Sequence, residues 1–189
     1  AQPLKGLSVV DIGCGGGILS EPMARMGATV TGLDPARGNV DVARTHAVEM
    51  GLSIDYREAI IEELVAEGAR FDIVLAMEVI EHVADVDGFV QACAAALKPG
   101  GLIVMATLNR TMKAYALAIL GAEYVMRWVP KGTHQWEKFL KPDELAGMIG
   151  ASGLDLIDRA GVIYRPFADE WALSDDMDVN YMMAARKAD

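Results

Sequence analysis

The chain has 189 residues, of which 52% are hydrophobic and 23% are charged, and its net charge is -10. This length suits one α/β domain with a sizeable buried core, and the composition excludes an intrinsically disordered chain. The acidic charge would repel phosphates, which argues against a nucleic-acid partner. The two cysteines are too few for a secreted disulfide framework, so they favour a reducing cytoplasm.

Short apolar runs alternate with helical patterns along the chain. The predicted strands are residues 7–12, 29–33, 54–57, 71–76, 102–107, 154–164 and 179–186. The predicted helices are residues 17–26, 39–50, 89–97 and 141–152. Alternation of this kind indicates βαβ units. We therefore expect a single α/β domain over residues 1–189, with a seven-stranded, mostly parallel sheet and helices on both faces.

A glycine-rich loop, Asp11-Ile12-Gly13-Cys14-Gly15-Gly16-Gly17, joins the first predicted strand to the first helix. Glycines let a ligand approach the backbone, and free amides at a helix start suit a carboxylate or phosphate. Asp34 ends the second strand, where a carboxylate can accept both hydroxyls of a ribose. A dinucleotide fingerprint needs a glycine where Ile18 stands, whereas Asp11 can hold the ammonium of a cationic amino acid. The loop therefore favours S-adenosylmethionine over a dinucleotide, and Cys14 within it is interpreted as a packing residue.

From this loop onward the sequence resembles class I methyltransferases and, more narrowly, the O-methyltransferases of ubiquinone biosynthesis. The general signature lies at residues 10–17, 32–34 and 97–101. The narrower signature consists of five ordered matches, at residues 77–83, 107–111, 121–124, 129–134 and 178–182. Members of the family carry a helical segment before the first strand, with an arginine that contacts the cofactor, whereas seven residues precede Ser8 here.

The resemblance implies a class I methyltransferase Rossmann-like fold with a helical insertion after the fifth strand. It implies an enzyme that methylates polyprenylated hydroxyphenols or catechols, of the 2-polyprenyl-6-hydroxyphenol and 3-demethylubiquinol types, with S-adenosylmethionine. By resemblance, Asp34 would bind the ribose, Met77 would line the pocket, and Ala59 and Ile60 would lie near the adenine. With the loop residues, the expected cofactor contacts are Asp11, Gly13, Gly15, Asp34, Ala59, Ile60 and Met77.

Three residues that follow the fourth predicted strand are candidate catalytic groups. Glu78, Glu81 and His82 would share one face of a helix, because they are spaced i, i+3 and i+4. Methylation of a phenol requires a phenolate, and the unperturbed pKa of a phenol is near 10. Two carboxylates and an imidazole could hold Mg²⁺ or another divalent cation, a role that the resemblance supports, or His82 could act alone as the base. The alternative is structural: the glutamates favour the helix start while His82 packs on the sheet.

An apolar and locally basic insertion is expected at residues 110–136. Residues 109–141 carry a charge of +4, which leaves -14 on the rest of the chain. On a helical wheel, Lys113, Glu123 and Arg127 fall within an arc of about 80°, so nearly all of the remaining surface of such a helix would be apolar. We interpret the segment as a lid that contacts a bilayer through residues 110–130 and admits a polyprenyl substrate. The alternative is a helix buried in its own domain or in a dimer interface.

The residues that flank this insertion are candidate substrate contacts. Asn109, Lys131, Thr133 and His134 could contact the substrate ring, or they could be turn residues that close the lid. No run reaches the eighteen or so apolar residues that span a bilayer. The expected location is therefore cytoplasmic and peripheral on the inner face of the membrane, with a complex of ubiquinone-biosynthesis enzymes as a candidate partner.

Two other functions stay open at this stage. The first is a class I methyltransferase for a different small apolar acceptor, against which the sequence of the insertion argues. The second is a catalytically weak, membrane-associated module that holds partner enzymes together. A calorimetric titration with S-adenosylmethionine or its demethylated product distinguishes the two, because absence of binding would favour the module.

Overall fold

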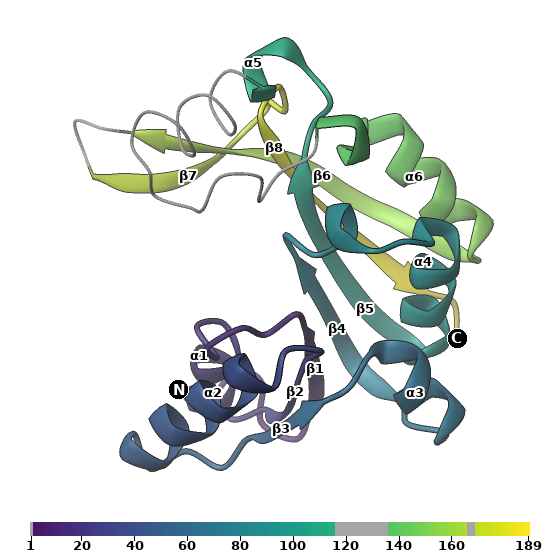
Figure 1. The fold of residues 1–189 in the computed structure, drawn as a ribbon. Helices are drawn as coiled ribbons and strands as arrows, with labels where there is room; N and C mark the ends of the chain where they lie inside the picture. The colour runs from purple at the N-terminus through teal and green to yellow at the C-terminus, as the bar shows by residue number, and fades with distance from the viewer. Residues whose placement is uncertain (1, 116–135, 166–168) are drawn as a thin grey trace.

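The computed structural model describes residues 2–115, 136–165 and 169–189 of the chain (Figure 1). Eight strands form one sheet in the order β3-β2-β1-β4-β5-β8-β6-β7. In chain order they are β1 (Ser8–Ile12), β2 (Thr29–Asp34), β3 (Asp55–Glu58), β4 (Phe71–Met77), β5 (Leu97–Leu108), β6 (Leu154–Arg165), β7 (Glu170–Ser174) and β8 (Asn180–Lys187). The structure therefore confirms the α/β class and adds one strand, β7, to the seven that were expected.

The first five strands pair in parallel, as the βαβ pattern predicts. β8 runs antiparallel between β5 and β6, and β7 pairs antiparallel with β6 at the edge. The strand order reverses between β1 and β4, because the chain builds β2 and β3 outward on one side and β4 and β5 on the other. In a sheet of this kind a ligand crevice lies at the carboxyl ends of the strands beside the reversal.

Four of the six helices match those that the periodicity predicted, with shifted ends; a fifth lies at the start of the expected insertion, and one was not predicted. They are α1 (Ser20–Arg25), α2 (Arg37–Glu49), α3 (Ile61–Ala66), α4 (Val86–Ala95), α5 (Met112–Ala114) and α6 (Pro142–Ala151), with the 3₁₀ turns η1 (Ile80–His82) and η3 (Trp136–Lys138). The missed helix, α3, has six residues, which is too short for a helical period to be recognised. None of the helices within the described residues is long and apolar enough to span a bilayer.

Helices cover both faces of the sheet, as expected. Successive side chains in a strand point to opposite faces, so Val10 packs in the large core that includes α3, α4 and α6, whereas Val9 packs with the α1 residue Met23. Figure 1 shows α3, α4 and α6 on one side of the sheet and α1 and α2 on the other. Both layers end at the carboxyl edge of β1 and β4, where the site described below is formed.

At the opposite, amino-terminal edge of the sheet, one half-buried carboxylate links neighbouring strands. Asp72 Oδ2 accepts hydrogen bonds from the Ser8 amide at 2.7 Å, the Ser8 hydroxyl at 2.6 Å and Lys98 Nζ at 2.8 Å. The bonds from Lys98 and Ser8 hold the pKa of Asp72 at about 2. This carboxylate therefore links β1, β4 and the beginning of β5 while it is ionised.

Replacing Asp72 by asparagine should lower the free energy of unfolding by about 2 kcal/mol at pH 7, because a hydrogen bond to a charged group contributes about 1.5–3 kcal/mol. The pKa of Asp72 is depressed in the folded chain, so its contribution is present above pH ~4 and is lost as the pH falls toward 2. Urea titrations between pH 2.5 and 7 measure both effects. Asp55→Asn removes an exposed pair with Arg57 and is the control, with an expected change below about 0.5 kcal/mol. An equal loss in both variants would contradict the assignment.

Candidate active site

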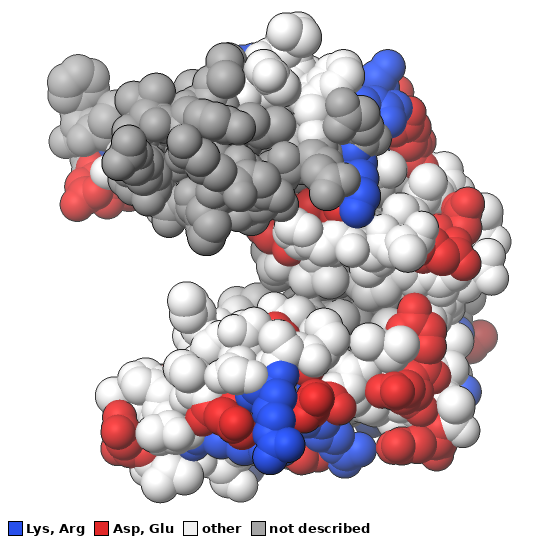
Figure 2. Space-filling view, in the orientation of Figure 1, with Lys and Arg blue, Asp and Glu red and all other residues white. Residues whose placement is uncertain are grey.

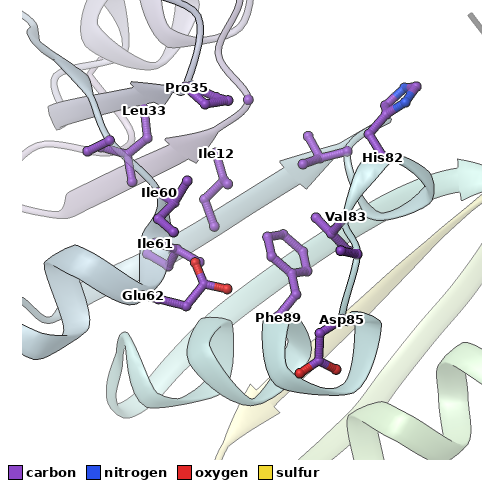
Figure 3. A pocket seen from close by; sticks show the side chains of 14 residues that line it. Ile12, Leu33, Pro35, Ile60, Ile61, Glu62, His82, Val83, Asp85 and Phe89 are labelled. Carbon is purple, nitrogen blue, oxygen red and sulfur yellow. The ribbon is translucent and has the colours of Figure 1, made fainter.

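An apolar pocket of about 440 Å³ opens at the carboxyl ends of β1 and β2. Ile12 and Leu33 lie at one side, and Phe89 points into it from α4 (Figure 3). Ala59 and Ile60 line it from the segment after β3, where they were expected beside an adenine. An apolar slot beside strand ends suits a planar base. The face drawn in Figure 2 is hollowed above the part that contains α1 and α2.

The glycine loop packs tightly from both sides, so two of its glycines have no room for a side chain. At Gly13, which lines the pocket with φ +68°, a Cβ would stand 2.4 Å from Val79 Cγ2. At Gly17, with φ +88°, a Cβ would stand 2.2 Å from the Tyr56 hydroxyl oxygen. Tyr56 from β3 is buried beneath the loop and was not singled out from the sequence. Its bulk in an otherwise polar strand was the one available signal.

Asp34 is already arranged as a hydrogen-bond acceptor at the end of β2. It is 6% exposed. Its Oδ2 accepts from the Gly15 amide at 3.0 Å, and its Oδ1 accepts from the Ala36 amide at 2.8 Å and Asn39 Nδ2 at 3.2 Å. These bonds fix the carboxylate against the glycine loop. Asp34 therefore stands where a ribose-binding acid was predicted, and the same acid holds the loop in place.

Asp11, at the end of β1, is a buried carboxyl. It is 3% exposed, and the Ser20 hydroxyl donates to its Oδ2 at 2.6 Å. Burial raises the pKa of Asp11 to about 6, although the bond from Ser20 lowers it in part. Cys14 is also buried, and burial together with the charges of Asp11 and Asp34 raises the pKa of its thiol to about 12. A thiol in that state is a packing group, as the sequence indicated.

The predicted helical face that would carry Glu78, Glu81 and His82 is not formed. Met77 ends β4, and Glu78 then adopts a left-handed conformation with φ +55°, held by a hydrogen bond from its amide to the Ala106 carbonyl at 2.8 Å. Only a single 3₁₀ turn, η1, follows. The helical spacing rule therefore does not apply, because Glu78 precedes the turn and its backbone is not helical.

The two glutamates nevertheless lie together, and His82 does not join them. Glu81 is 3% exposed, and the Thr107 hydroxyl from β5 donates to its Oε2 at 2.7 Å. The protein around the Glu78 carboxyl and the adjacent carboxyl of Glu81 raise the pKa of Glu78. The residue as a whole is nevertheless exposed. Glu81 Oε1 is buried without a hydrogen-bond partner within the described part of the chain. The His82 ring lines the apolar pocket and points away from its interior (Figure 3).

The three predicted ligands do not make a metal site. Nowhere in residues 2–115, 136–165 and 169–189 do three His, Cys, Asp or Glu side chains gather closely enough to hold a metal ion. The physical reason is the left-handed turn at Glu78, which leaves the two glutamates together and His82 on the wall of the apolar pocket. The arrangement is a carboxyl pair next to an apolar pocket, in which the carboxyl of Glu81 disfavours ionisation of Glu78.

Asn109 lies in a different pocket from the one that holds Ala59 and Ile60. It is 7% exposed, its Nδ2 donates to the Met177 carbonyl at 2.8 Å, and it lines a pocket of about 430 Å³ with Arg110 and Glu144. The other predicted substrate contacts, Lys131, Thr133 and His134, lie outside the described residues, as does most of the predicted lid.

The two ends of the predicted insertion are joined. Tyr115 and Trp136 pack edge to face with ring centroids 6.5 Å apart, and Trp136 Nε1 donates to the Thr111 carbonyl at 3.2 Å. Beneath them, Leu108, Ala114 and Phe139 form a small buried cluster. Tyr115 and Trp136, the described residues on either side of 116–135, thus lie over one common base.

Comparison with known proteins relates this geometry to a family. A family model described as a methyltransferase domain matches residues 10–105. The chain is 60% identical over 185 residues to a ubiquinone biosynthesis O-methyltransferase of Methylobacterium nodulans, which covers 98% of this chain and 74% of that protein. It is 58% identical over 188 residues to the protein of the same name in Rhizobium leguminosarum bv. trifolii, with coverage of 100% and 75%.

Solved structures support the fold. The magnesium protoporphyrin IX methyltransferase of Synechocystis PCC 6803, solved with bound SAH, superposes with a TM-score of 0.73 at 20% identity, over 98% of this chain and 76% of that one. An S-adenosylmethionine-dependent methyltransferase from Mesorhizobium loti superposes with a TM-score of 0.69 at 21% identity, over 99% and 94%. With its glycine loop, the acid that ends β2 and close relatives along nearly its whole length, the chain belongs to the ubiquinone biosynthesis O-methyltransferase family of class I S-adenosylmethionine-dependent methyltransferases.

Proposed function

We propose that the chain transfers the methyl group of S-adenosylmethionine to a phenolic oxygen of a polyprenylated hydroxyphenol or catechol, as an enzyme of ubiquinone biosynthesis. The observation that carries this proposal is the pairing of two features at one sheet edge. The preset acceptor Asp34 lies beside the apolar pocket, and the Glu78–Glu81 carboxyl pair follows the neighbouring strand β4. The names of the close relatives support the same reaction.

The cofactor would lie across the carboxyl ends of β1, β2 and β4. Asp34 would accept the ribose hydroxyls, the apolar slot that includes Ala59 and Ile60 would receive the adenine, and Gly13 and Gly15 would pass close beneath the ligand. Asp11 would face the ammonium of the methionine part. Met77 ends β4 directly before Glu78, and would line the cofactor there.

Methyl transfer then needs a base and a correct alignment. The phenolic proton passes to the carboxyl pair, the phenolate oxygen bonds to the methyl carbon, and the bond between that carbon and the sulfonium sulfur breaks with its electrons on sulfur. Thr107 fixes the orientation of Glu81, and Glu78 adjoins it. His82 is the alternative base from the neighbouring pocket wall.

A divalent cation does not enter these steps. A cation would supply charge to stabilise a phenolate, but of the three proposed ligands only Glu78 and Glu81 lie together. Mg²⁺ usually keeps several waters and is held by one or two carboxylates together with substrate oxygens, so the chelation step of the assay below tests whether the pair also holds a cation. We assign the pair to proton transfer.

The deciding experiment is a methyl-transfer assay on a short-tailed catechol, with magnesium present and after chelation. Methylation of the catechol oxygen supports the proposal, and a rate that survives chelation supports the carboxyl pair. Binding of the demethylated cofactor without turnover on this acceptor would favour a different small acceptor or an assembly module. Failure to bind the cofactor would refute the enzyme.

We further propose that the enzyme is cytoplasmic and meets its prenylated substrate at the inner face of the membrane through residues 110–130. The support is the sequence of this segment and its basic flanks, which include Arg110, Lys138 and Lys141. Asn109, Lys131, Thr133 and His134 are the proposed contacts with the polar part of the substrate. A complex with other enzymes of the pathway is a further proposal of the same kind.

The double change Leu117→Glu/Ile119→Glu should reduce binding to anionic liposomes at least tenfold, because each aliphatic side chain buried in an interface contributes on the order of 1.5–3 kcal/mol. Co-sedimentation with vesicles of mixed anionic and neutral phospholipid measures the partition. Val48→Glu, at a position 78% exposed on α2, is the control and should leave binding unchanged. Equal binding by wild type and the double variant would exclude this segment as the membrane contact.

A further inference from the structure

A second polar residue lies with Asp11 beneath the glycine loop. Ser20 is the first residue of α1 and is fully buried, and its hydroxyl donates to Asp11 Oδ2 at 2.6 Å. The bond spans the loop from its first residue in β1 to the helix that follows it. Buried hydroxyls are normally paired, and this one is paired with the acid that is proposed above to receive the ammonium of the cofactor.

We propose that Ser20 is a positioning residue for the amino-acid end of the cofactor, because its hydroxyl fixes the rotation of the Asp11 carboxylate and favours its ionised form. This inference rests on the proposed function, in which Asp11 receives the ammonium group. The bond occupies Oδ2 and so directs Oδ1 at a defined angle. Without the Ser20 hydroxyl the carboxylate would keep only the weaker hydrogen bond from the Ser20 backbone, so its rotation would be less restricted and its ionised form less favoured.

The surroundings of Asp11 make this hydroxyl important. In the sheet Asp11 lies between Gly32 of β2 and Leu75 of β4, which offer no polar side chain. The titratable groups that adjoin it are Cys14 from the loop and Tyr56 from β3, and burial raises the pKa of each to about 12. Both are therefore neutral near pH 7.

The charged groups farther out have partners of their own. Glu21 on α1 pairs with Arg25 and with His46 of α2, and the bond with His46 is the main reason that the pKa of Glu21 is lowered. Asp34 accepts its bonds from the Gly15 and Ala36 amides. Ser20 therefore supplies the main hydrogen bond that favours an ionised Asp11, against a burial that raises its pKa to about 6.

A pH dependence follows from this arrangement. Below pH ~6 Asp11 takes up a proton, the ammonium of the cofactor loses its counter-charge, and affinity falls. Removing the Ser20 hydroxyl raises the pKa of Asp11 further, so the fall in affinity begins at a higher pH. The loss caused by Ser20→Ala should therefore be larger at pH 6 than at pH 8. A residue that only stabilised the fold would weaken binding equally at both.

The test is calorimetric binding of S-adenosylhomocysteine to wild type, Ser20→Ala and Ser20→Thr from pH 5.5 to 8. We expect Ser20→Ala to bind about tenfold more weakly at pH 6 and within about threefold of wild type at pH 8, as loss of one hydrogen bond to a charged group implies. Ser20→Thr keeps the hydroxyl and should restore both values. Ser152→Ala, which removes a hydroxyl bonded to the Met148 carbonyl on α6, is the matched control.

The outcomes separate this inference from the function on which it rests. A pH-independent loss in Ser20→Ala, no loss, or no recovery in Ser20→Thr would overturn the role of Ser20 while leaving the cofactor site intact. If the affinity of wild type did not fall below pH ~6, the role of Ser20 would likewise be overturned while the cofactor site remained intact. No binding by wild type at any pH would overturn the proposed function and this inference together. Thermal unfolding of each variant verifies that the domain is folded.

Discussion

Asp34→Asn should weaken the binding of S-adenosylmethionine by about a hundredfold. Two ribose hydroxyls can donate to this carboxylate, hydrogen bonds to a charged acceptor contribute about 1.5–3 kcal/mol each, and 1.4 kcal/mol corresponds to a factor of ten. The amide also places an NH₂ group among the Gly15 amide, the Ala36 amide and Asn39 Nδ2, all of which donate to Asp34. The change thus disturbs the loop as well as the ribose contact. Calorimetric titration with the cofactor or its demethylated product measures the loss.

Asp41→Asn is a matched control for this prediction. Asp41 lies on α2 with its side chain 58% exposed, where it pairs with Arg37 and Arg44 at the surface. Its replacement should leave the dissociation constant within about twofold of wild type, because exposed ion pairs contribute little. If Asp34→Asn also bound within threefold of wild type while remaining folded, the ribose assignment would be wrong.

Glu81→Gln should lower the methyl-transfer rate constant by at least about a hundredfold, the usual size of a contribution from a positioned base. Glutamine has the same shape and can still accept from the Thr107 hydroxyl, but it cannot hold the phenolic proton. Affinity for S-adenosylhomocysteine should not change. The variant also removes the charge that helps to raise the pKa of Glu78. The remaining rate should therefore begin to fall at a lower pH than the wild-type rate does. Single-turnover rates from pH 5 to 9 measure both effects.

Two further variants make this result decisive. Glu67→Gln removes an exposed carboxylate that pairs with Arg57, and it should keep the wild-type rate. His82→Asn tests the alternative base on the pocket wall. A large rate loss in His82→Asn together with a near-normal rate in Glu81→Gln would transfer the role of base from the carboxyl pair to His82.

The sequence was sufficient for the part of the fold that depends on local pattern and a known motif. Residues 7–12 and 29–33 were predicted as strands, the glycine loop was placed between them, and Asp34 was placed at the end of the second one, all of which the structure confirms. Ala59 and Ile60, which the resemblance puts near the adenine, line the apolar pocket. The two strands, the loop and the position of Asp34 follow from alternation and spacing along a short stretch of chain.

The remainder depends on contacts between distant residues, which a single sequence does not encode locally. The spacing of Glu78, Glu81 and His82 suggested a helix, but the hydrogen bond from the Glu78 amide to Ala106 on β5 turns the backbone left-handed. Tyr56 was not recognised as the support of the glycine loop, because that contact joins residues 39 positions apart. Strand β7 is defined only by its pairing with β6.

The contact of Trp136 with Tyr115 and Thr111 bears on how the acceptor range of the family can change. Because Tyr115 and Trp136 meet over one shared base, we expect that exchanging the residues between them would leave the sheet registers on either side unaltered. If those residues contact the acceptor as proposed, acceptor preference and cofactor affinity would be separable traits. A chimera that carries the corresponding stretch of a relative should inherit the acceptor range of the donor while keeping the cofactor dissociation constant of the host.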